Sequence, residues 1–378
     1  MSALFTINTC KSYGCRNLGL AESPDYVWPD YRLGFAALHC RACGSYPPLF
    51  NERQFRDWLS ARLTEYAIES GLFCPACYQK TSIRYGHNPL GTQRLQCRRC
   101  KKVWTPGNVL HEQNTSLTQL VTTPLIVPFQ GASADQKLYA LFSFDALCGH
   151  VVHVSTNFTS HPAGDSLLYQ WKGVAEPLSR HEDIIERVNF RAEQFLSRSQ
   201  FDEIQYASAV QKRNARGAIL RPVIAAHGHF RVLKILFPDV MTHIVAHECF
   251  LRGAVITAWS ELFRRQQGSL WFIEEEIVDA GCAAPWRARG KTHHGWWQNR
   301  WQLWQQGDNL KMTCSLTGGD ESLAETLSLT ASRHFVHWLH QQPAFLSVGQ
   351  YSARRVTQSL KALAQQYNAA ITATAPDG

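Results

Sequence analysis

Residues 74–100 read CPACYQKTSIRYGHNPLGTQRLQCRRC, and residues 101–104 continue the stretch as KKVW. Two Cys-x-x-Cys pairs, Cys74 with Cys77 and Cys97 with Cys100, are separated by nineteen residues. Each pair turns tightly enough to direct both sulfurs to a common centre, and four thiolates at this spacing are typical of a tetrahedral zinc site. The stretch therefore predicts one structural zinc ion held by these four cysteines.

The residues between the two pairs favour a β-hairpin, which is the usual body of a zinc ribbon, because Tyr85, Gly86 and Gly91 suit its strands and turn.

From Phe73 to Leu110 there are seven Lys or Arg side chains and no Asp or Glu. A zinc tetrathiolate subtracts two charges and leaves this unit positive, so counterion release favours binding to a phosphate backbone. We therefore expect double-stranded DNA as the partner, although a merely solvated basic surface is the alternative. The expected contacts are Lys80, Arg84, Arg94, Arg98, Arg99, Lys101, Lys102 and Trp104.

The order of these residues resembles the N-terminal zinc ribbon of InsA-type and related bacterial insertion-sequence transposases. The shared pattern is CPxC, a Gly, then G-x-Q-R-x-x-C-x-x-C-x-K-x-W, matched here by Cys74, Pro75, Cys77, Gly91, Gln93, Arg94, Cys97, Cys100, Lys102 and Trp104. The resemblance implies that the ribbon helps to recognise DNA, usually with a helix-turn-helix directly after it. The chain departs from the family there, because residues 105–123 contain Pro106 and Gly107 and show no pair of amphipathic helices.

A second group of cysteines precedes the ribbon: Cys10 and Cys15, then Cys40 and Cys43 after twenty-four residues. Its spacing predicts a second zinc site, with His39 as a substitute for one sulfur. Alternatively, the four cysteines are ordinary small buried residues. We expect Tyr26, Trp28 and Tyr31 to form the small core of this module. The expected cofactors are thus two structural Zn²⁺ ions.

The composition indicates how many domains the chain forms and in which cellular compartment we expect it. The 378 residues are 45% hydrophobic, which is enough for two or three domains, and 38 basic against 30 acidic residues give a net charge of +8. Eight of the twelve cysteines have metal-type spacings, and the first residues do not resemble a signal peptide. We expect a cytoplasmic, nucleoid-associated protein without membrane partners, and we also consider a homodimer.

Hydrophobic patterns after the ribbon predict an alternation of strands and helices. Strands are expected at 125–129, 138–144, 151–154, 222–226, 242–246 and 270–273, and helices at 51–70, 182–196, 251–263, 296–305, 322–340 and 352–368. Three antiparallel strands followed by alternating helices and strands is the order of an RNase H-like domain, the catalytic fold of the transposases that the ribbon resembles.

These patterns give the expected organisation of an α+β or α/β chain. It comprises an N-terminal zinc module (1–50), a connecting helix (51–72), a DNA-binding zinc ribbon (73–115), an RNase H-like domain (116–280) and a helical C-terminal extension (281–378).

The resemblance also implies a catalytic site, in which three carboxylates would hold two divalent metal ions. The first expected strand of the domain, residues 125–131, contains no acid. We therefore expect no catalytic residues, and a transposase-derived, zinc-dependent DNA-binding protein that acts as a transcriptional regulator without nuclease activity. One alternative is an active transposase that uses Mg²⁺ with Asp145, Glu248 and Glu274. A second alternative is a zinc-ribbon scaffold for protein interactions.

Two further groups of residues carry competing interpretations. His243 and His247, with His227 and His229 upstream, could form a metal site, but satisfied or exposed histidines are favoured. In residues 285–304 we expect Trp297, Trp301 and Trp304 to face the core from a helix, and residues 287–294 to form a loop that faces DNA.

Overall fold

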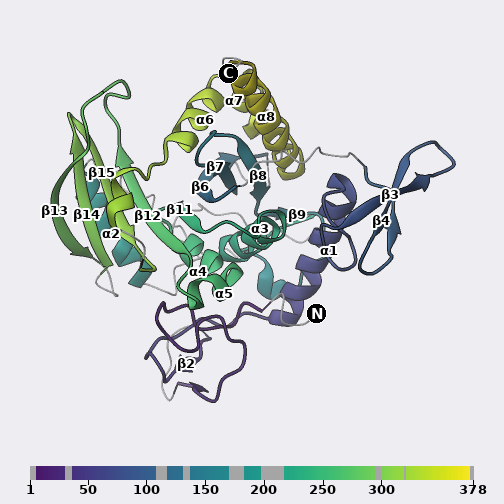
Figure 1. Cartoon of the computed structure of the whole chain (residues 1–378), viewed down its shortest axis with the longest axis horizontal. Coiled ribbons are helices and arrows are strands. Elements are labelled where there is room, and N and C mark those ends of the chain that lie inside the picture. Colours follow the sequence, from purple (N-terminus) through teal and green to yellow (C-terminus); the bar gives the residue numbers. More distant parts are fainter. Residues whose placement is uncertain are drawn as a thin grey trace.

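An eight-stranded sheet forms the centre of the computed structural model (Figure 1). The structure describes residues 6–29, 36–107, 117–130, 137–169, 183–196, 217–294, 299–318 and 321–374. Neighbouring strands follow the order β13-β14-β15-β12-β11-β6-β7-β8. Their bounds are β6 (Gln119–Pro128), β7 (Lys137–Asp145), β8 (Val151–Thr156), β11 (Thr242–Ala246), β12 (Ser269–Glu276), β13 (Arg287–His294), β14 (Asn299–Gln306) and β15 (Asn309–Ser315).

The sheet is mixed. Strands β6, β7 and β8 form an antiparallel meander, whereas β11 and β12 lie parallel to β6. Parallel neighbours need a long crossover, usually a helix, and here α3 (Pro222–Leu236) precedes β11 while α4 (Cys249–Ala258) and α5 (Ser260–Arg264) connect β11 to β12. Strands β15, β14 and β13 then extend the sheet beyond β12 in antiparallel fashion.

Two consecutive threonines of β6 show how the faces of the sheet are covered. The Thr122 hydroxyl lies 2.6 Å from that of Ser143, which lies 2.8 Å from Nε2 of His229 on α3. The Thr123 hydroxyl lies 2.6 Å from that of Ser332 on α6 (Thr330–His340). Because side chains alternate along a strand, α3 covers one face of the meander and α6 covers the other.

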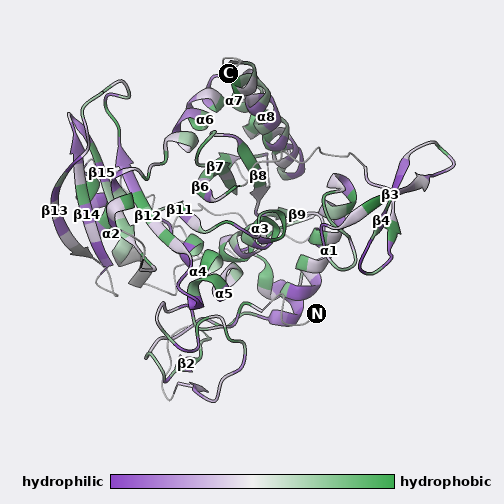
Figure 2. Cartoon of the chain, viewed as in Figure 1, coloured by the Kyte–Doolittle hydropathy of each residue, from purple (hydrophilic) through white to green (hydrophobic). Residues whose placement is uncertain are grey.

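Hydrophobic side chains fill both interfaces, and the central strands and the α3 and α4 helices are rich in them (Figure 2). Under α6, the rings of Phe142 and Phe144 lie 5.0 and 5.6 Å from that of Phe335. At the edge of the sheet, the Asn368 side chain of α8 (Ala353–Thr374) hydrogen-bonds both the backbone N–H and the C=O of Val151 in β8. This contact blocks an edge that could otherwise pair with another strand.

Helix α1 (Glu52–Ser70) connects the N-terminal modules to this body. The Asn51 side chain caps its first turn by accepting a hydrogen bond from the Gln54 N–H, and Gly71 ends it in the left-handed conformation at φ 69°. Trp58 is buried against α3, and its indole N–H donates to the Thr159 hydroxyl at 3.0 Å. The helix is thus fixed at both ends and along its buried face.

Most of the remaining elements are short. They are β1 (Tyr26–Val27), β2 (His39–Cys40), β3 (Ser82–His87), β4 (Gln93–Cys97), β5 (Val103–Trp104), β9 (Phe158–Thr159), β10 (Ala218–Ile219), the 3₁₀ helices η2 (Asp165–Leu167), η4 (Glu321–Glu325) and η5 (Val348–Gln350), and the helices α2 (Ile184–Leu196) and α7 (Pro343–Leu346).

Most predicted elements are confirmed. The strands at 125–129, 138–144, 151–154, 242–246 and 270–273 correspond to β6, β7, β8, β11 and β12, and the helices at 51–70, 182–196 and 352–368 correspond to α1, α2 and α8. The helix at 251–263 is divided into α4 and α5, and the helix at 322–340 is a 3₁₀ turn followed by α6.

Four predictions are wrong. Residues 222–226 form the first turns of α3, where Pro222 occupies a position that needs no backbone N–H. Residues 299–306 form strand β14, because pairing with β13 and β15 overrides the helical spacing of the tryptophans. The expected helical extension from residue 281 therefore begins with three strands of the main sheet. Trp28 is 71% exposed and so lies outside any module core, while Tyr31 falls outside the described residues.

The close approach of α1 to α3 gives a prediction about stability. A Cβ at Gly228 of α3 would lie 2.6 Å from the Trp58 ring. This overpacking should cost about 1–3 kcal/mol of folding free energy, which exceeds the roughly 1 kcal/mol that alanine gains over glycine in helix propensity. Gly228→Ala should therefore lower the urea midpoint of unfolding. Gly253→Ala in α4 is the matched control, because its Cβ would meet only the flexible Lys11 side chain at 3.3 Å. A Gly228→Ala protein as stable as the control would contradict this packing.

Candidate metal centres and nucleic-acid interface

The ribbon cysteines Cys74, Cys77, Cys97 and Cys100 converge as predicted. Their sulfurs all lie within 4.8 Å of one another; the Cys74 and Cys100 sulfurs are 3.5 Å apart, and so are those of Cys77 and Cys97. Zinc–sulfur bonds of about 2.3 Å in a tetrahedron would place the sulfurs about 3.8 Å apart. The geometry therefore fits one zinc ion.

The two knuckles of the ribbon share one backbone conformation. The Tyr78 N–H donates to the Cys74 carbonyl at 2.9 Å, and the Lys101 N–H donates to the Cys97 carbonyl at 3.1 Å. Both donors are in the left-handed region, with φ of 57° and 62°, which is uncommon for residues other than glycine. Each knuckle thus closes one residue after its second cysteine and turns both sulfurs inward.

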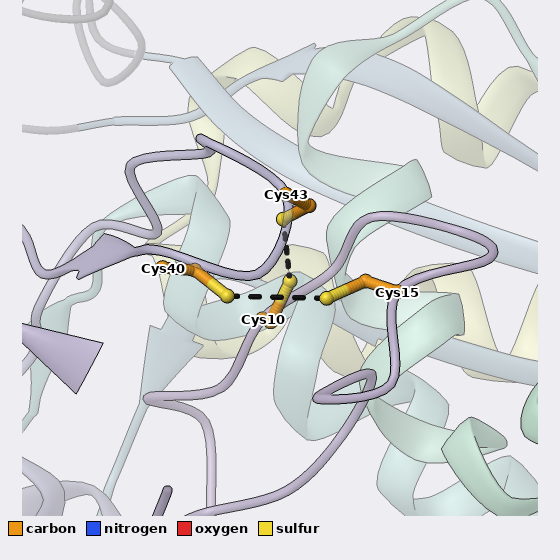
Figure 3. Close-up of side chains that lie close together, drawn as sticks. All are labelled: Cys10, Cys15, Cys40 and Cys43. Atoms are coloured by element: carbon orange, nitrogen blue, oxygen red, sulfur yellow. Dashed lines mark hydrogen bonds between the residues drawn. The ribbon is translucent and has the colours of Figure 1, made fainter. Parts of the chain in front are cut away.

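The N-terminal cysteines form a second quartet, shown in Figure 3. The sulfurs of Cys10 and Cys43 are 3.6 Å apart, and those of Cys15 and Cys40 are 3.9 Å apart. The Asn17 side chain donates to the Cys40 sulfur at 3.4 Å, a contact that helps to orient a metal ligand. His39 stacks on Tyr46 with 4.6 Å between ring centroids, so this site consists of four cysteines.

Burial makes four of the eight thiols poor acids in the absence of a cation, whereas hydrogen bonds outweigh burial and lower the pKa of Cys43 to about 6 and that of Cys97 to about 7. Burial raises the pKa of the Cys10, Cys15 and Cys74 thiols, and it raises the pKa of Cys77 to about 12, because a buried thiolate loses its hydration. A coordinated metal ion reverses this preference and deprotonates its thiols. None of the cysteines whose side chains the structure describes forms a disulfide, and both quartets are compatible with zinc.

The ribbon presents its cations to solvent. Lys80, Arg84, Arg98, Arg99, Lys101 and Lys102 are exposed, whereas Arg94 is half-buried with its guanidinium 5.8 Å from the centroid of the Tyr85 ring. Residues 73–107 contain no acid. The ribbon lies at one side of the molecule and β13–β14 at the opposite side (Figure 1).

Trp104 is predicted from the sequence to contact DNA, but the structure places it in the core of the ribbon. It is 7% exposed and sits opposite Leu95 in the β4–β5 pair. A ribbon of three short strands needs these two side chains to cover its cysteines, so the ring is not available to a nucleic acid. Residue type and spacing alone do not distinguish this role from a surface one.

The ribbon is attached to α1 rather than to the sheet. The Thr64 hydroxyl donates to the Pro75 carbonyl at 3.2 Å, and the Gly107 N–H donates to the Ile68 carbonyl at 2.8 Å. Phe73 stacks on Tyr66 with 5.8 Å between centroids. The helix that packs on α3 therefore also positions the basic surface.

The candidate catalytic carboxylates lie on three separate elements. Asp145 ends β7 and accepts a hydrogen bond from the Leu147 N–H at 2.8 Å. Glu248 is buried at the start of α4, and Glu274 on β12 forms an ion pair with Arg187 at 3.3 Å. Among the residues described, the groups of three or more potential metal ligands within 4.8 Å are the two cysteine quartets, so these three acids do not form such a group.

Two polar contacts join α6 to the sheet, and the sequence patterns predict neither of them. Besides the Thr123–Ser332 hydrogen bond, Arg333 forms an ion pair with Glu275, whose side chain is 3% exposed and also accepts from the Leu329 N–H at 3.1 Å. These contacts join the helix to the middle of β6 and to the carboxyl end of β12. No local sequence pattern could reveal them, because the partners are far apart in the chain.

The histidines form no metal site among the described side chains. Both ring nitrogens of His229 lie 2.8 Å from serine hydroxyls, those of Ser143 and Ser155. His243 packs against Trp259, and His247 against Phe272 and Trp301. The favoured interpretation, satisfied or exposed histidines, holds for His229 but not for His243, which is buried and has no hydrogen bond to either ring nitrogen among the described residues.

The segment expected as a DNA-facing loop is instead strand β13, at the edge of the sheet. Arg287 and Arg289 are exposed on it, while Lys291 and the neighbouring Arg300 form ion pairs with Glu321 at 3.0 and 3.1 Å. Trp301 is buried as expected, although from a strand, and Trp304 is half-buried. Trp297 lies outside the described residues.

Comparison with known proteins adds no relative: no protein-family model, curated protein or solved structure matches the chain significantly. Within the described ranges, every helix is too short or too polar to cross a bilayer.

The quartets predict the metal content of the purified protein. Elemental analysis should find two zinc ions per chain in the wild type and one in Cys100→Ser, because a serine hydroxyl is a far poorer zinc ligand than a thiolate. Cys148→Ser is the control, since Cys148 is exposed in the β7–β8 turn and belongs to neither quartet. It should retain two ions. Equal zinc content in both variants would contradict the assignment of the ribbon site.

Proposed function

We propose that this chain is a zinc-dependent DNA-binding protein derived from a transposase, with a role in transcriptional regulation. The observation that carries the proposal is the ribbon: a zinc-compatible cysteine quartet accompanied by seven cations and no acid between residues 73 and 107. Such a surface gains free energy from the release of counterions when it binds phosphates.

Exposure supports this assignment. Arg98, Arg99, Lys101 and Lys102 surround the second knuckle, where the left-handed turn at Lys101 fixes the backbone. Their side chains belong to a rigid unit, so the entropy cost of binding is smaller than for a flexible tail. Phosphate contacts of this kind give affinity and orientation but carry no sequence readout.

The order of strands supports an RNase H-like assignment for the body. Three antiparallel strands, β6 to β8, are followed by β11 and β12, which lie parallel to β6 with helices in the crossovers. This is the arrangement expected for the transposases that the ribbon resembles.

The carboxyl ends of β6, β11 and β12 are the place where an open α/β sheet usually binds its ligand. The Glu275–Arg333 ion pair joins α6 to the sheet near the carboxyl end of β12, and the Thr123–Ser332 hydrogen bond joins it midway along β6. A neutral pair and a charge-compensated pair do not supply the carboxylate cluster that divalent ions need. These contacts favour a body that supports DNA binding without cutting DNA.

An active transposase is the alternative that uses Asp145, Glu248 and Glu274. Cleavage of bound DNA in Mg²⁺ or Mn²⁺, abolished by Glu248→Ala, would support it and contradict our proposal. If the chain instead binds a partner protein and shows no salt-dependent affinity for DNA, the interaction scaffold is favoured.

The proposal predicts how salt affects DNA affinity. Fluorescence anisotropy with a mixed-sequence duplex should give log Kd that rises linearly with log salt. Changing Arg98, Arg99, Lys101 and Lys102 to Gln should reduce the slope by about 0.9 for each phosphate that the variant no longer neutralises. The control changes Arg53, Arg264, Arg265 and Arg355 to Gln, which alters net charge equally at exposed sites outside the ribbon. Equal slopes for the two variants would refute the assigned interface.

A further inference from the structure

The tip of the β3–β4 hairpin presents one apolar side chain to solvent. Leu90 is 89% exposed, compared with 78% for Leu147 and 71% for Trp28. Leaving a leucine in water forgoes the free energy of burial. Single exposed leucines are common on protein surfaces, so exposure alone does not indicate a function for Leu90. A functional role depends on where Leu90 lies in the fold.

The tip is rigid before any partner binds. The Asn88 N–H donates to the Thr92 carbonyl and the Gly91 N–H to the Asn88 carbonyl, both at 2.9 Å. The Asn88 side-chain oxygen accepts from the N–H groups of Leu90 at 3.0 Å and Thr92 at 2.8 Å. Gly91 adopts φ +79°, which closes the turn. The backbone that carries Leu90 is therefore preorganised, and little ordering cost remains for binding.

The stem of the hairpin below this apolar tip carries one arginine on each strand. Residues 83–87 of β3 are exposed, and Figure 1 shows β3 and β4 extending away from the body. Arg84 and Arg94 lie on the two strands, and the ribbon contains no acid. The matching partner has an apolar centre between two rows of negative charge. Stacked base pairs between the phosphate backbones of a duplex have this arrangement.

We propose that Leu90 is a wedge that enters the minor groove of duplex DNA, inserts between two base pairs and kinks the duplex. The inference rests on the proposed DNA-binding function. Leucine is one of the apolar side chains that minor-groove proteins insert in this way, and the cost of unstacking is offset by the extra contacts of bent DNA. Pyrimidine–purine steps such as TA unstack most easily, so they are the expected sites.

The test measures binding and bending on the same DNA. The probe is a duplex of about 30 bp with a central TA step and a fluorescent donor and acceptor at its two ends. Wild-type protein should raise energy transfer on binding, because a kink shortens the distance between the ends. Leu90→Ala should still bind with the same salt slope and within about tenfold of wild-type affinity, but without the rise in energy transfer. Leu90→Met, which keeps an apolar side chain of similar reach, should restore the rise.

Leu147→Ala is the matched control, because this leucine is also exposed in a turn but lies in the body. It should bend DNA as the wild type does. Wild-type binding without a change in energy transfer, or equal bending by Leu90→Ala, would overturn the wedge and leave the DNA-binding proposal intact. Failure of the wild type to bind any duplex would overturn the DNA-binding proposal and the wedge together.

Discussion

Each cysteine quartet brings four ionisable sulfurs within 4.8 Å of one another, and a bound cation is what makes four thiolates stable at that separation. The constraint is strongest in the ribbon, whose core contains only Leu95 and Trp104 beside its cysteines. A unit with so little apolar burial cannot hold three short strands by the hydrophobic effect alone. The shape of the basic surface therefore depends on the metal site.

Helix α1 transmits this geometry to the body. Its C-terminal half contacts the ribbon through Thr64 and Ile68, while Trp58 fixes it to α3 and to Thr159. The ribbon is thus held at one side of the sheet, and β13 and β14 lie at the other (Figure 1). Helix α6 is joined to the middle of β6 and to the carboxyl end of β12 by polar side chains that satisfy one another. In our account the ribbon binds DNA and the body positions the ribbon.

The features that depend on local spacing could be predicted from the sequence. The two quartets follow from cysteine positions, and α1 follows from its Asn51 cap and apolar periodicity.

Short apolar runs are ambiguous, because five residues are too few to distinguish a strand from a helix. Residues 222–226 contain β-branched side chains typical of strands, but they begin a helix. Tryptophans three and four residues apart suggest a helix where pairing with β13 and β15 imposes a strand. The Thr123–Ser332 and Ser143–His229 contacts join residues 209 and 86 positions apart, and no window of sequence contains both partners.

Lysine footprinting by mass spectrometry tests the central claim most directly. The protein is acetylated with and without a saturating mixed-sequence duplex, first with its zinc and then after chelation. Our account predicts that DNA protects Lys101 and Lys102 in the zinc form, leaves the exposed Lys137 of β7 unchanged, and gives no protection once the metal is removed. Reactivity of Lys101 and Lys102 that is unaltered in a saturated complex, or protection that persists without zinc, would contradict it.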